Sequence, residues 1–555
     1  MHGLMMDYQL TIPAMARRAE QLHARRPIAS RNADGSVHHT TYGEVLARSR
    51  RLIGALESLG VRRGDRVATF CWNHHQHLEA YYAIPSMGAV AHMLNIRLHP
   101  DELAYVANHA GDSVVIVDRV LLPQFMAFRD RIAAKHVIVV DGGSDLPAGM
   151  LDYETLLAAS PEVAFDEDID EKTAAGMCYT SGTTGRSKGV VYSHRSTALH
   201  SLASGTWDLE FCRERDVILA IVPMFHANAW GIPYTAMLFG AAQVLPGPFL
   251  DPANILSLVA SERVTLITGV PTVCNALLQA LDADPARYDV SSLRAMFAGG
   301  AAVPEGLIRA FEERHNIRVV QGWGMTETSP IASKATMSLA LDGVDRDERF
   351  RMRATQGRPL PFIETRVRAE SGSIAPWDGV ALGELEVRGP WVADAYYDAP
   401  GTADRFTADG WFKTGDIVSM DANGYIIIRD RSKDVIKSGG EWISSVALEN
   451  MIMRHPAVLE AAVVGLQHPR WDERPLALVV ARAGAACSAE DILAHLEPHF
   501  PKFWLPTGVE FVREIPRTSV GKFNKLAIRE HYRDYFTGAP GLPNVSAARE
   551  SSLTS

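Results

Sequence analysis

Short, unbroken apolar runs separated by stretches of helical periodicity most constrain the fold of this chain. Such runs stand at 113–117, 136–140, 217–222 and 264–268. Apolar runs of this length without alternation are typical of strands that are buried on both faces. Strands separated by helical segments indicate βαβ units, and therefore parallel sheets. The sequence predicts an α/β fold of several subdomains, with parallel-rich sheets flanked by helices in a large N-terminal domain.

The pattern changes in the last third of the chain. Apolar and polar residues alternate over 363–368 and 383–388, which predicts antiparallel strands with one solvated face and hence a β-rich subdomain. Further strand candidates at 461–466, 477–482 and 509–512 surround a helical pattern at 489–496, which indicates a small α+β unit.

The predicted domain boundaries follow from these changes. We expect an N-terminal domain over 1–430, a small C-terminal domain over 431–536 and a tail over 537–555. The tail is rich in Gly, Pro, Ser and Ala, a composition typical of disorder.

Charge and cysteine usage exclude several classes of protein. Lys and Arg number 55 against 65 Asp and Glu, so the net charge of −10 provides no basic field for coating nucleic acid. Five widely spaced cysteines without a CxxC pair exclude a disulfide scaffold and a zinc ribbon, and they fit a reducing compartment. The N-terminus lacks the pattern of a secretory signal, and the longest apolar stretch is too short to span a bilayer. We expect a cytoplasmic protein.

The most informative segment is Tyr-Thr-Ser-Gly-Thr-Thr-Gly-Arg-Ser-Lys-Gly at 179–189. Its hydroxyl and backbone N–H groups can surround phosphate oxygens, with Lys188 as a point charge. Lys188 is followed by Gly, so this is not a P-loop of the GxxxxGK[ST] type. A Gly-, Ser- and Thr-rich surface loop without a ligand is the alternative interpretation of this segment alone.

Five more motifs follow this loop in a fixed order, at 298–304, 321–330, 411–416, 430–442 and 516–522. Each is weakly specific, but the ordered series resembles the adenylate-forming superfamily of acyl-CoA synthetases, luciferases and peptide-synthetase adenylation domains. The resemblance extends from Tyr42 to Arg533. It implies that ATP and CoA are co-substrates, with Mg²⁺ as the metal and a small carboxylic acid as the partner.

The resemblance implies a nucleotide site with particular roles. Gly300 lets the backbone approach adenine, Trp323 offers a stacking face where the family usually has Tyr, and Asp416 accepts hydrogen bonds from ribose. The full ATP- and AMP-binding set implied is Thr180, Ser181, Gly182, Thr183, Thr184, Gly185, Lys188, Gly300, Ala301, Gln321, Gly322, Trp323, Thr326, Asp416, Arg431 and Lys433.

The resemblance also implies the metal ligands and the catalytic residues. Thr180 and Glu327 offer hard oxygen ligands for Mg²⁺. Lys522 is the catalytic cation between the acyl carboxylate and the α-phosphate, where negative charge builds up. Lys437 is the second catalytic lysine. Because Lys522 and the loop after Lys437 would serve two steps at one place, we expect the C-terminal domain to rotate about a hinge near Lys433.

The implied acyl-binding set is His226, Ala227, Trp230 and Gly300. His226 stands where amino-acid-activating relatives carry Asp, so no carboxylate is offered to a substrate ammonium. The His-x-Asn-Ala-Trp run resembles bacterial long- and medium-chain fatty acyl-CoA synthetases, in which this tryptophan gates the acyl tunnel. It also resembles methylmercaptopropionate-CoA ligases. A packing role for Trp230 is the alternative.

The segment Lys437–Trp442 resembles the CoA-binding loop of the same branch, and it implies that Gly439, Gly440 and Trp442 contact CoA. We therefore expect an AMP-forming acyl-CoA ligase for a medium- or long-chain fatty acid. A methylmercaptopropionate or aryl (cinnamic) acid ligase, a luciferase-like oxidase and a non-enzymatic acyl-nucleotide binding protein are the alternatives. The acid, ATP and CoA are the expected partners, without nucleic acid or a transmembrane segment, and a homodimer is expected by analogy only.

Overall fold

The computed structural model describes residues 1–143, 145–180, 186–206, 212–438, 441–482, 484–517 and 523–538. Of the predicted tail, residues 539–555 lie outside this description. The chain forms two compact units. The first comprises Met1–Glu364 and Val387–Phe412, and the second comprises Thr365–Glu386 and Lys413–Ser555. The sequence-based domain boundary between residues 430 and 431, with its hinge near Lys433, stays a prediction.

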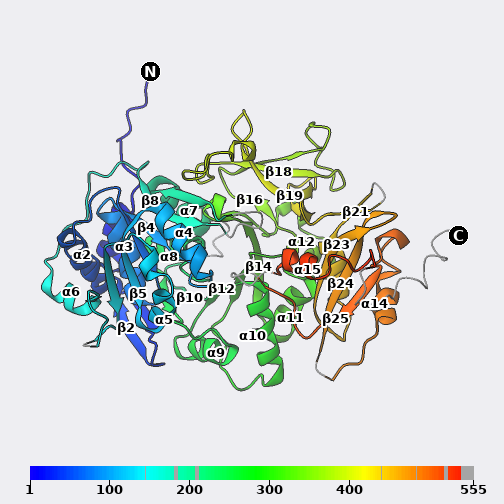
Figure 1. Ribbon diagram of the computed structural model, residues 1–555, viewed down its shortest axis with the longest axis horizontal. Helices are drawn as coiled ribbons and strands as arrows, with labels where there is room; N and C mark the ends of the chain where they lie inside the picture. The colour runs from blue at the N-terminus through cyan, green and yellow to red at the C-terminus, as the bar shows by residue number, and fades with distance from the viewer. Residues whose placement is uncertain are drawn as a thin grey trace. The chain divides into compact units, whose positions relative to one another are not determined.

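The first unit contains a seven-stranded sheet that is parallel except for its last strand (Figure 1). The strand order is β7 (Leu151–Asp152), β6 (His136–Val140), β5 (Asp112–Asp118), β3 (Arg66–Phe70), β4 (Val90–Met93), β8 (Ala174–Tyr179) and β9 (Gly189–Ser193). The apolar runs at 113–117 and 136–140 thus form buried strands, as predicted.

A nine-stranded sheet forms the other layer of this unit. Its order is β16 (Arg358–Pro359), β15 (Ile331–Lys334), β14 (Arg318–Gly324), β13 (Ala295–Ala298), β12 (Leu266–Gly269), β10 (Val217–Ala220), β11 (Ala242–Leu245), β1 (Pro27–Arg31) and β2 (Val37–Thr41). The strands from β14 to β1 are parallel, and antiparallel strands form both edges. The runs at 217–222 and 264–268 give β10 and β12.

Helices connect these strands, and their apolar faces bury the sheets. The helices are α1 (Ile12–His23), α2 (Tyr42–Ser58), α3 (His75–Ser86), α4 (Pro100–Ala110), α5 (Leu122–Met126), α6 (Tyr153–Ala159), α7 (His194–Thr206), α8 (Ile232–Phe239), α9 (Pro252–Ser261), α10 (Pro271–Ala283), α11 (Glu305–His315) and α12 (Arg346–Arg353). The core of the larger sheet combines side chains of α9, α10 and α11 with those of β10, β12 and β13. Such burial stabilises each large apolar side chain by about 1.5–3 kcal/mol.

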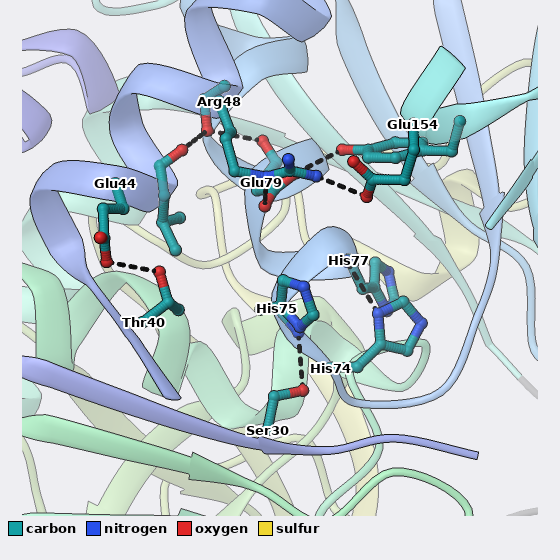
Figure 2. Close-up of polar contacts among 12 residues, drawn as sticks. Ser30, Thr40, Glu44, Arg48, His74, His75, His77, Glu79 and Glu154 are labelled. Atoms are coloured by element: carbon teal, nitrogen blue, oxygen red, sulfur yellow. Dashed lines mark hydrogen bonds and ion pairs between the residues drawn. The ribbon is translucent and has the colours of Figure 1, made fainter. Parts of the chain in front are cut away.

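The start of α3 shows how polar groups are accommodated between the layers (Figure 2). The imidazole of His74 caps α3 by accepting a hydrogen bond from the backbone N–H of His77. Further along, the fully buried carboxylate of Glu79 pairs with Arg48 at 2.6 Å and accepts from the Tyr153 hydroxyl at 2.7 Å. His74 and Glu79 are thus partnered, as the desolvation of buried polar groups requires.

The second unit is built mainly from antiparallel sheets. A four-stranded sheet runs in the order β17 (Glu364–Arg368), β18 (Gly383–Arg388), β19 (Phe412–Met420) and β20 (Ile426–Arg431). A five-stranded sheet contains β21 (Ile436–Ser438), β22 (Glu441–Ile443), β23 (Val458–His468), β24 (Asp472–Ala481) and β25 (Gly508–Phe511), with helices α13 (Ser445–Ile452), α14 (Ala489–Leu496) and α15 (Lys525–His531). The predicted α/β fold with a β-rich subdomain and a small α+β unit is confirmed. Among the described residues, no helix is long and apolar enough to cross a membrane.

The order of strands marks where a ligand is expected. In the nine-stranded sheet the chain passes from β10 to β11 on one side and then to β12 on the other side of β10. Ligands of open α/β sheets bind beyond the carboxyl ends of the strands at such a switch point. The segment that follows β10 carries His226 and Trp230.

Candidate active site

Three predicted segments meet at the carboxyl edge of the nine-stranded sheet. Trp230 follows β10, Gly300 follows β13, and Trp323 lies at the end of β14. These strands are joined in parallel through β12, so their carboxyl ends share one edge. The sequence motifs are far apart along the chain, and the sheet brings them together.

Trp230 contacts the glycine segment directly. Its ring packs edge-on against Phe297, with the ring centroids 5.8 Å apart. A Cβ atom on Gly299 would lie 3.4 Å from the Trp230 ring and 2.8 Å from the carbonyl oxygen of Gly322. Glycine is therefore required at 299 by a close approach of backbone and indole. The predicted acyl residue Trp230 and the predicted nucleotide segment thus pack directly against each other.

The backbone that carries Trp230 is strained. Residues Ala227, Asn228, Ala229 and Trp230 all have positive φ angles, between 44° and 58°. The left-handed conformation costs an L-residue roughly 1–2 kcal/mol. Such strain persists only where the surroundings hold it, and it is often found at functional sites.

Asn73 and Tyr81 hold the segment that leads into this strained turn. The Asn73 side chain donates to the carbonyl oxygens of Ala220 and Val222, at 2.9 Å each, and accepts from the Met224 N–H at 2.7 Å. Tyr81 donates to the Met224 carbonyl oxygen. His226, half-buried, begins the turn, and its carbonyl oxygen accepts from the Ala229 N–H at 3.1 Å. Sequence reasoning missed Asn73 and Tyr81, because no motif connects them to this segment.

The Gly300 side of the site is positioned by Gln321. Its Nε2 donates to the carbonyl oxygens of Ala354 and Thr355, at 3.2 and 2.7 Å. Its Oε1 accepts from the Val303 N–H at 2.5 Å, which fixes the turn containing Gly300. Gly300 adopts φ +80°, a conformation that favours glycine. The amide of Gln321, predicted to bind nucleotide, thus orders the loop that would do so.

The neighbouring residues predicted to bind nucleotide differ in their exposure and in the space around them. A Cβ on Gly322 would lie 2.2 Å from the Phe297 ring, so glycine is required there. Ala301 is exposed, and Trp323 is buried with 6% exposure. The carbonyl oxygen of Thr326 accepts from the Tyr192 hydroxyl at 2.9 Å.

The phosphate-loop candidate joins β8 to β9. Thr180 and Lys188 close its base: the Thr180 N–H donates to the Lys188 carbonyl oxygen at 2.9 Å, and the Lys188 N–H donates to the Thr180 hydroxyl at 3.4 Å. Five predicted residues of this loop lie outside the described residues, namely Ser181, Gly182, Thr183, Thr184 and Gly185.

Tyr396 connects the base of this loop to the predicted metal ligand. Its hydroxyl donates to Oε1 of Glu327 at 2.6 Å, and the Lys188 ammonium lies 5.1 Å from the centre of its ring. Burial and the Glu327 charge raise the pKa of Tyr396, so its hydroxyl stays a donor. Lys188 and Glu327, 139 residues apart in sequence, thus share one neighbour. Sequence reasoning missed Tyr396, because it lies outside the recognised motifs.

In the second unit, Asp416 and Arg431 face each other on adjacent strands. Their positions pair in the β19–β20 ladder, and Arg431 Nε lies 2.7 Å from Asp416 Oδ1. Asp416 is 1% exposed, and Lys433 is exposed two residues beyond Arg431. The ion pair fixes the orientation of the carboxylate that is predicted to contact ribose.

The predicted CoA loop includes residues of two paired strands, β21 and β22. Lys437 pairs with Trp442 in the β21–β22 ladder, and the Lys437 N–H donates to Glu473 Oε2 at 2.9 Å. The side chain of Lys437 is exposed. Gly439 and Gly440 lie outside the described residues, as does the catalytic candidate Lys522. The roles of all these residues stay predictions.

Comparisons with known proteins identify the family. A family model described as AMP-binding enzyme matches residues 15–397, and one described as AMP-binding enzyme C-terminal domain matches residues 447–522. The chain is 48% identical over 538 residues to a long-chain-fatty-acid–CoA ligase of Thermus thermophilus, covering 96% of this chain and 98% of the relative. It is 41% identical over 546 residues to a 3-methylmercaptopropionyl-CoA ligase of Ruegeria lacuscaerulensis, covering 97% and 100%.

A solved structure agrees over nearly the whole length. ATP-bound MatB from Rhodopseudomonas palustris superposes with a TM-score of 0.81 at 28% identity, covering 95% of this chain and all of that one. Since one family model matches more than half of the chain and both relatives exceed 40% identity, the resemblance noted from the motifs is confirmed, and the chain belongs to the family of AMP-binding, adenylate-forming enzymes.

Proposed function

We propose that this enzyme is an ATP-dependent acyl-CoA ligase that activates a medium- or long-chain fatty acid. The prediction of an AMP-forming acid–CoA ligase is confirmed by the family and by the relatives named above. The observation that carries the choice of acid is the apolar packing of Trp230, Phe297 and Gly299. The segment that carries Trp230 begins after His226, where amino-acid-activating relatives carry a carboxylate. An apolar wall suits an alkyl chain and offers nothing to a substrate ammonium.

The reaction has two steps. In the first, a carboxylate oxygen of the acid attacks the α-phosphorus of ATP, and pyrophosphate leaves. In the second, the CoA thiol loses its proton and attacks the acyl carbon, and AMP leaves. Both reactants of the first step are anions, so cations must lie where negative charge builds up. Lys188 and Lys522 serve this purpose in our proposal.

Mg²⁺ fits the donors around Glu327. A buried carboxylate is a hard oxygen ligand, and Mg²⁺ in such sites is shared between one or two protein oxygens and substrate phosphates. Glu327 and Thr180 would hold the ion, which would neutralise phosphate charge. The Tyr396 hydroxyl keeps Glu327 oriented, and the Lys188 ammonium lies over the ring of the same tyrosine.

The second unit supplies the remaining roles. In our proposal Asp416 accepts hydrogen bonds from the ribose hydroxyls while Arg431 and Lys433 contact the nucleotide. Gly439, Gly440 and Trp442 contact the pantetheine arm of CoA in our proposal, and Lys437 is the second catalytic lysine. The part of the chain after Lys433 rotates about a hinge near that residue between the two steps.

A short thioether acid is the second candidate substrate. It is supported by the 41% identity to the 3-methylmercaptopropionyl-CoA ligase of Ruegeria lacuscaerulensis. An aryl acid such as cinnamate is a third. One methylene in an apolar pocket is worth about 1–3 kcal/mol, so chain-length preference is measurable as a several-fold change per carbon.

A ligation panel tests the proposal. We would measure kcat/KM for CoA-thioester formation with acids from propionate to palmitate, and with methylmercaptopropionate and cinnamate. We expect the maximum at a medium or long saturated chain. A maximum at methylmercaptopropionate or cinnamate would replace the fatty acid with that acid, and absence of acid-dependent pyrophosphate exchange would refute the ligase.

We also infer a cytoplasmic location and a homodimer. All five cysteines are free, which suits a reducing compartment. The dimer rests on analogy with related synthetases. Light scattering of the purified enzyme tests it, and a monomeric mass at assay concentration would rule it out.

A further inference from the structure

A buried polar network in the second unit connects the chain on both sides of the proposed hinge. Asp430 precedes Lys433 at the end of β20, and its carboxylate is fully buried. Its Oδ2 accepts from the backbone N–H of Ser445 at 2.6 Å, at the first turn of α13. The N-terminal end of a helix attracts negative charge, so this contact is favourable beyond the hydrogen bond itself.

Ser445 also contacts Lys525 of α15. Its hydroxyl lies 2.6 Å from the ammonium of Lys525, and this ammonium also pairs with Glu449 of α13 at 2.7 Å. Glu449 Oε1 accepts from the Val463 N–H at 2.8 Å, which fixes it against β23. Only 13% of the Lys525 side chain is exposed. Although burial alone would lower it, the nearby carboxylates of Glu449 and Asp430 raise the pKa of Lys525, which keeps it charged.

The residues of this network lie on both sides of the proposed hinge in the sequence. Ser445 lies just after the predicted CoA loop 437–442, and Lys525 lies three residues after the predicted catalytic Lys522. Asp430 lies on the other side of Lys433 from both of them. Rotation at Lys433 would therefore separate Asp430 from Ser445 and Lys525, while it would leave Ser445, Glu449 and Lys525 together.

A second contact provides the comparison. Arg529, one turn after Lys525 on α15, pairs with Asp434 at 2.7 Å. Asp434 follows Lys433, so it would move together with α15 and this ion pair would survive the rotation. The two acidic residues, four positions apart, thus lie on opposite sides of the hinge.

We propose that Asp430 is a latch that holds the part of the chain after Lys433 in one of its two working conformations, through Ser445 and Lys525. This inference rests on the proposed function and its hinge. Asp430 is a positioning residue, since it acts through α13 and α15 rather than on the substrates. The latch stabilises one conformation, so its removal slows the half-reaction that uses this conformation relative to the other.

The test compares Asp430→Ala with Asp434→Ala in the full-length enzyme. Adenylation is measured by fatty-acid-dependent pyrophosphate exchange, and thioester formation by the reaction of supplied acyl-AMP with CoA. We expect Asp430→Ala to change the ratio of the two rates by roughly tenfold, the factor that corresponds to about 1.4 kcal/mol. Asp434→Ala should leave this ratio within about twofold, because Asp434 and its partner Arg529 lie on the same side of Lys433 and their ion pair survives the rotation.

A distance measurement makes the result independent of activity. Fluorescent labels, one on the first unit and one on the chain after Lys433, would report the rotation as a change in distance. Asp430→Ala should shift the distribution of this distance, whereas Asp434→Ala should not. Asp430→Asn is the substitute if the alanine variant is too unstable to assay. It retains the volume and one acceptor oxygen, so its shift should be in the same direction and smaller. An unchanged rate ratio and an unchanged distribution in the Asp430 variants would overturn the latch. If the wild-type enzyme catalyses neither half-reaction, the proposed function is refuted instead.

Discussion

The hydroxyl of Tyr396 donates a 2.6 Å hydrogen bond to Oε1 of Glu327, and the Lys188 ammonium lies over the same tyrosine ring. Tyr396 therefore stands between the base of the phosphate-loop candidate and the predicted Mg²⁺ ligand. A neutral tyrosine hydroxyl thus orients the carboxylate that is predicted to hold Mg²⁺.

The first prediction concerns this pair. Glu327→Gln preserves volume but removes the charge, so we expect weaker apparent affinity for Mg²⁺–ATP and slower adenylation. Tyr396→Phe keeps the ring beneath Lys188 and removes only the orienting hydrogen bond, so its effect should be smaller and in the same direction. Mg²⁺ titration of pyrophosphate exchange measures both. If Glu327→Gln shows the same Mg²⁺ dependence as the wild type, Glu327 is not a metal ligand.

Trp230 provides the second prediction. Trp230→Ala removes the aromatic wall beside Gly299, so the chain-length profile of CoA ligation should change by several-fold per added carbon. The KM for ATP should change little. If activity instead falls equally for every acid, Trp230 is a packing residue and the acyl-wall interpretation fails.

The third prediction separates the two half-reactions. Lys522→Ala should slow adenylation by ~10²–10³-fold, the usual loss for one transition-state charge partner. Thioester formation from supplied acyl-AMP should survive in this variant. Lys433→Pro, which fixes φ at the proposed hinge, should spare adenylation more than thioester formation. Equal slowing of both steps by Lys522→Ala would contradict the two-conformation account.

A fourth prediction concerns stability and pH. Burial raises the pKa of Glu79 to about 7, although Arg48 and Tyr153 oppose the shift (Figure 2). The folded state thus holds this proton more tightly than the unfolded chain, in which the pKa is near 4.5. The resulting stabilisation is fully present below about pH 4.5 and is lost as the pH rises through about 7.

Glu79→Gln tests the assignment. The shift corresponds to about 3 kcal/mol at most, so the free energy of unfolding of the wild type should fall by up to that amount relative to the variant between about pH 4.5 and 7. Glu154→Gln is the matched control, because Glu154 pairs with the same Arg48 but is half-exposed. Equal pH dependence in the wild type and Glu79→Gln would show that Glu79 does not titrate in this range.

The sequence by itself determined the family, the α/β class and the order of the subdomains. Apolar runs such as 113–117 and 136–140 became parallel strands because a strand buried on both faces needs apolar residues at every position. The motifs at 179–189, 298–304 and 321–330 could be recognised because their glycines answer local backbone demands, such as the close approach at Gly299 and the positive φ at Gly300.

Only the tertiary structure decided which residues surround these motifs. Asn73 supports the strained Trp230 turn from 157 positions away, and Tyr396 connects Lys188 to Glu327. Contacts between residues so distant arise from the order of strands in two sheets, which local patterns do not encode. The Asp430–Ser445–Lys525 connection is of the same kind. A buried lysine and a buried aspartate look like surface residues in the sequence, and only the packing of α13 against β20 and of α15 against β23 brings them into one network through Ser445.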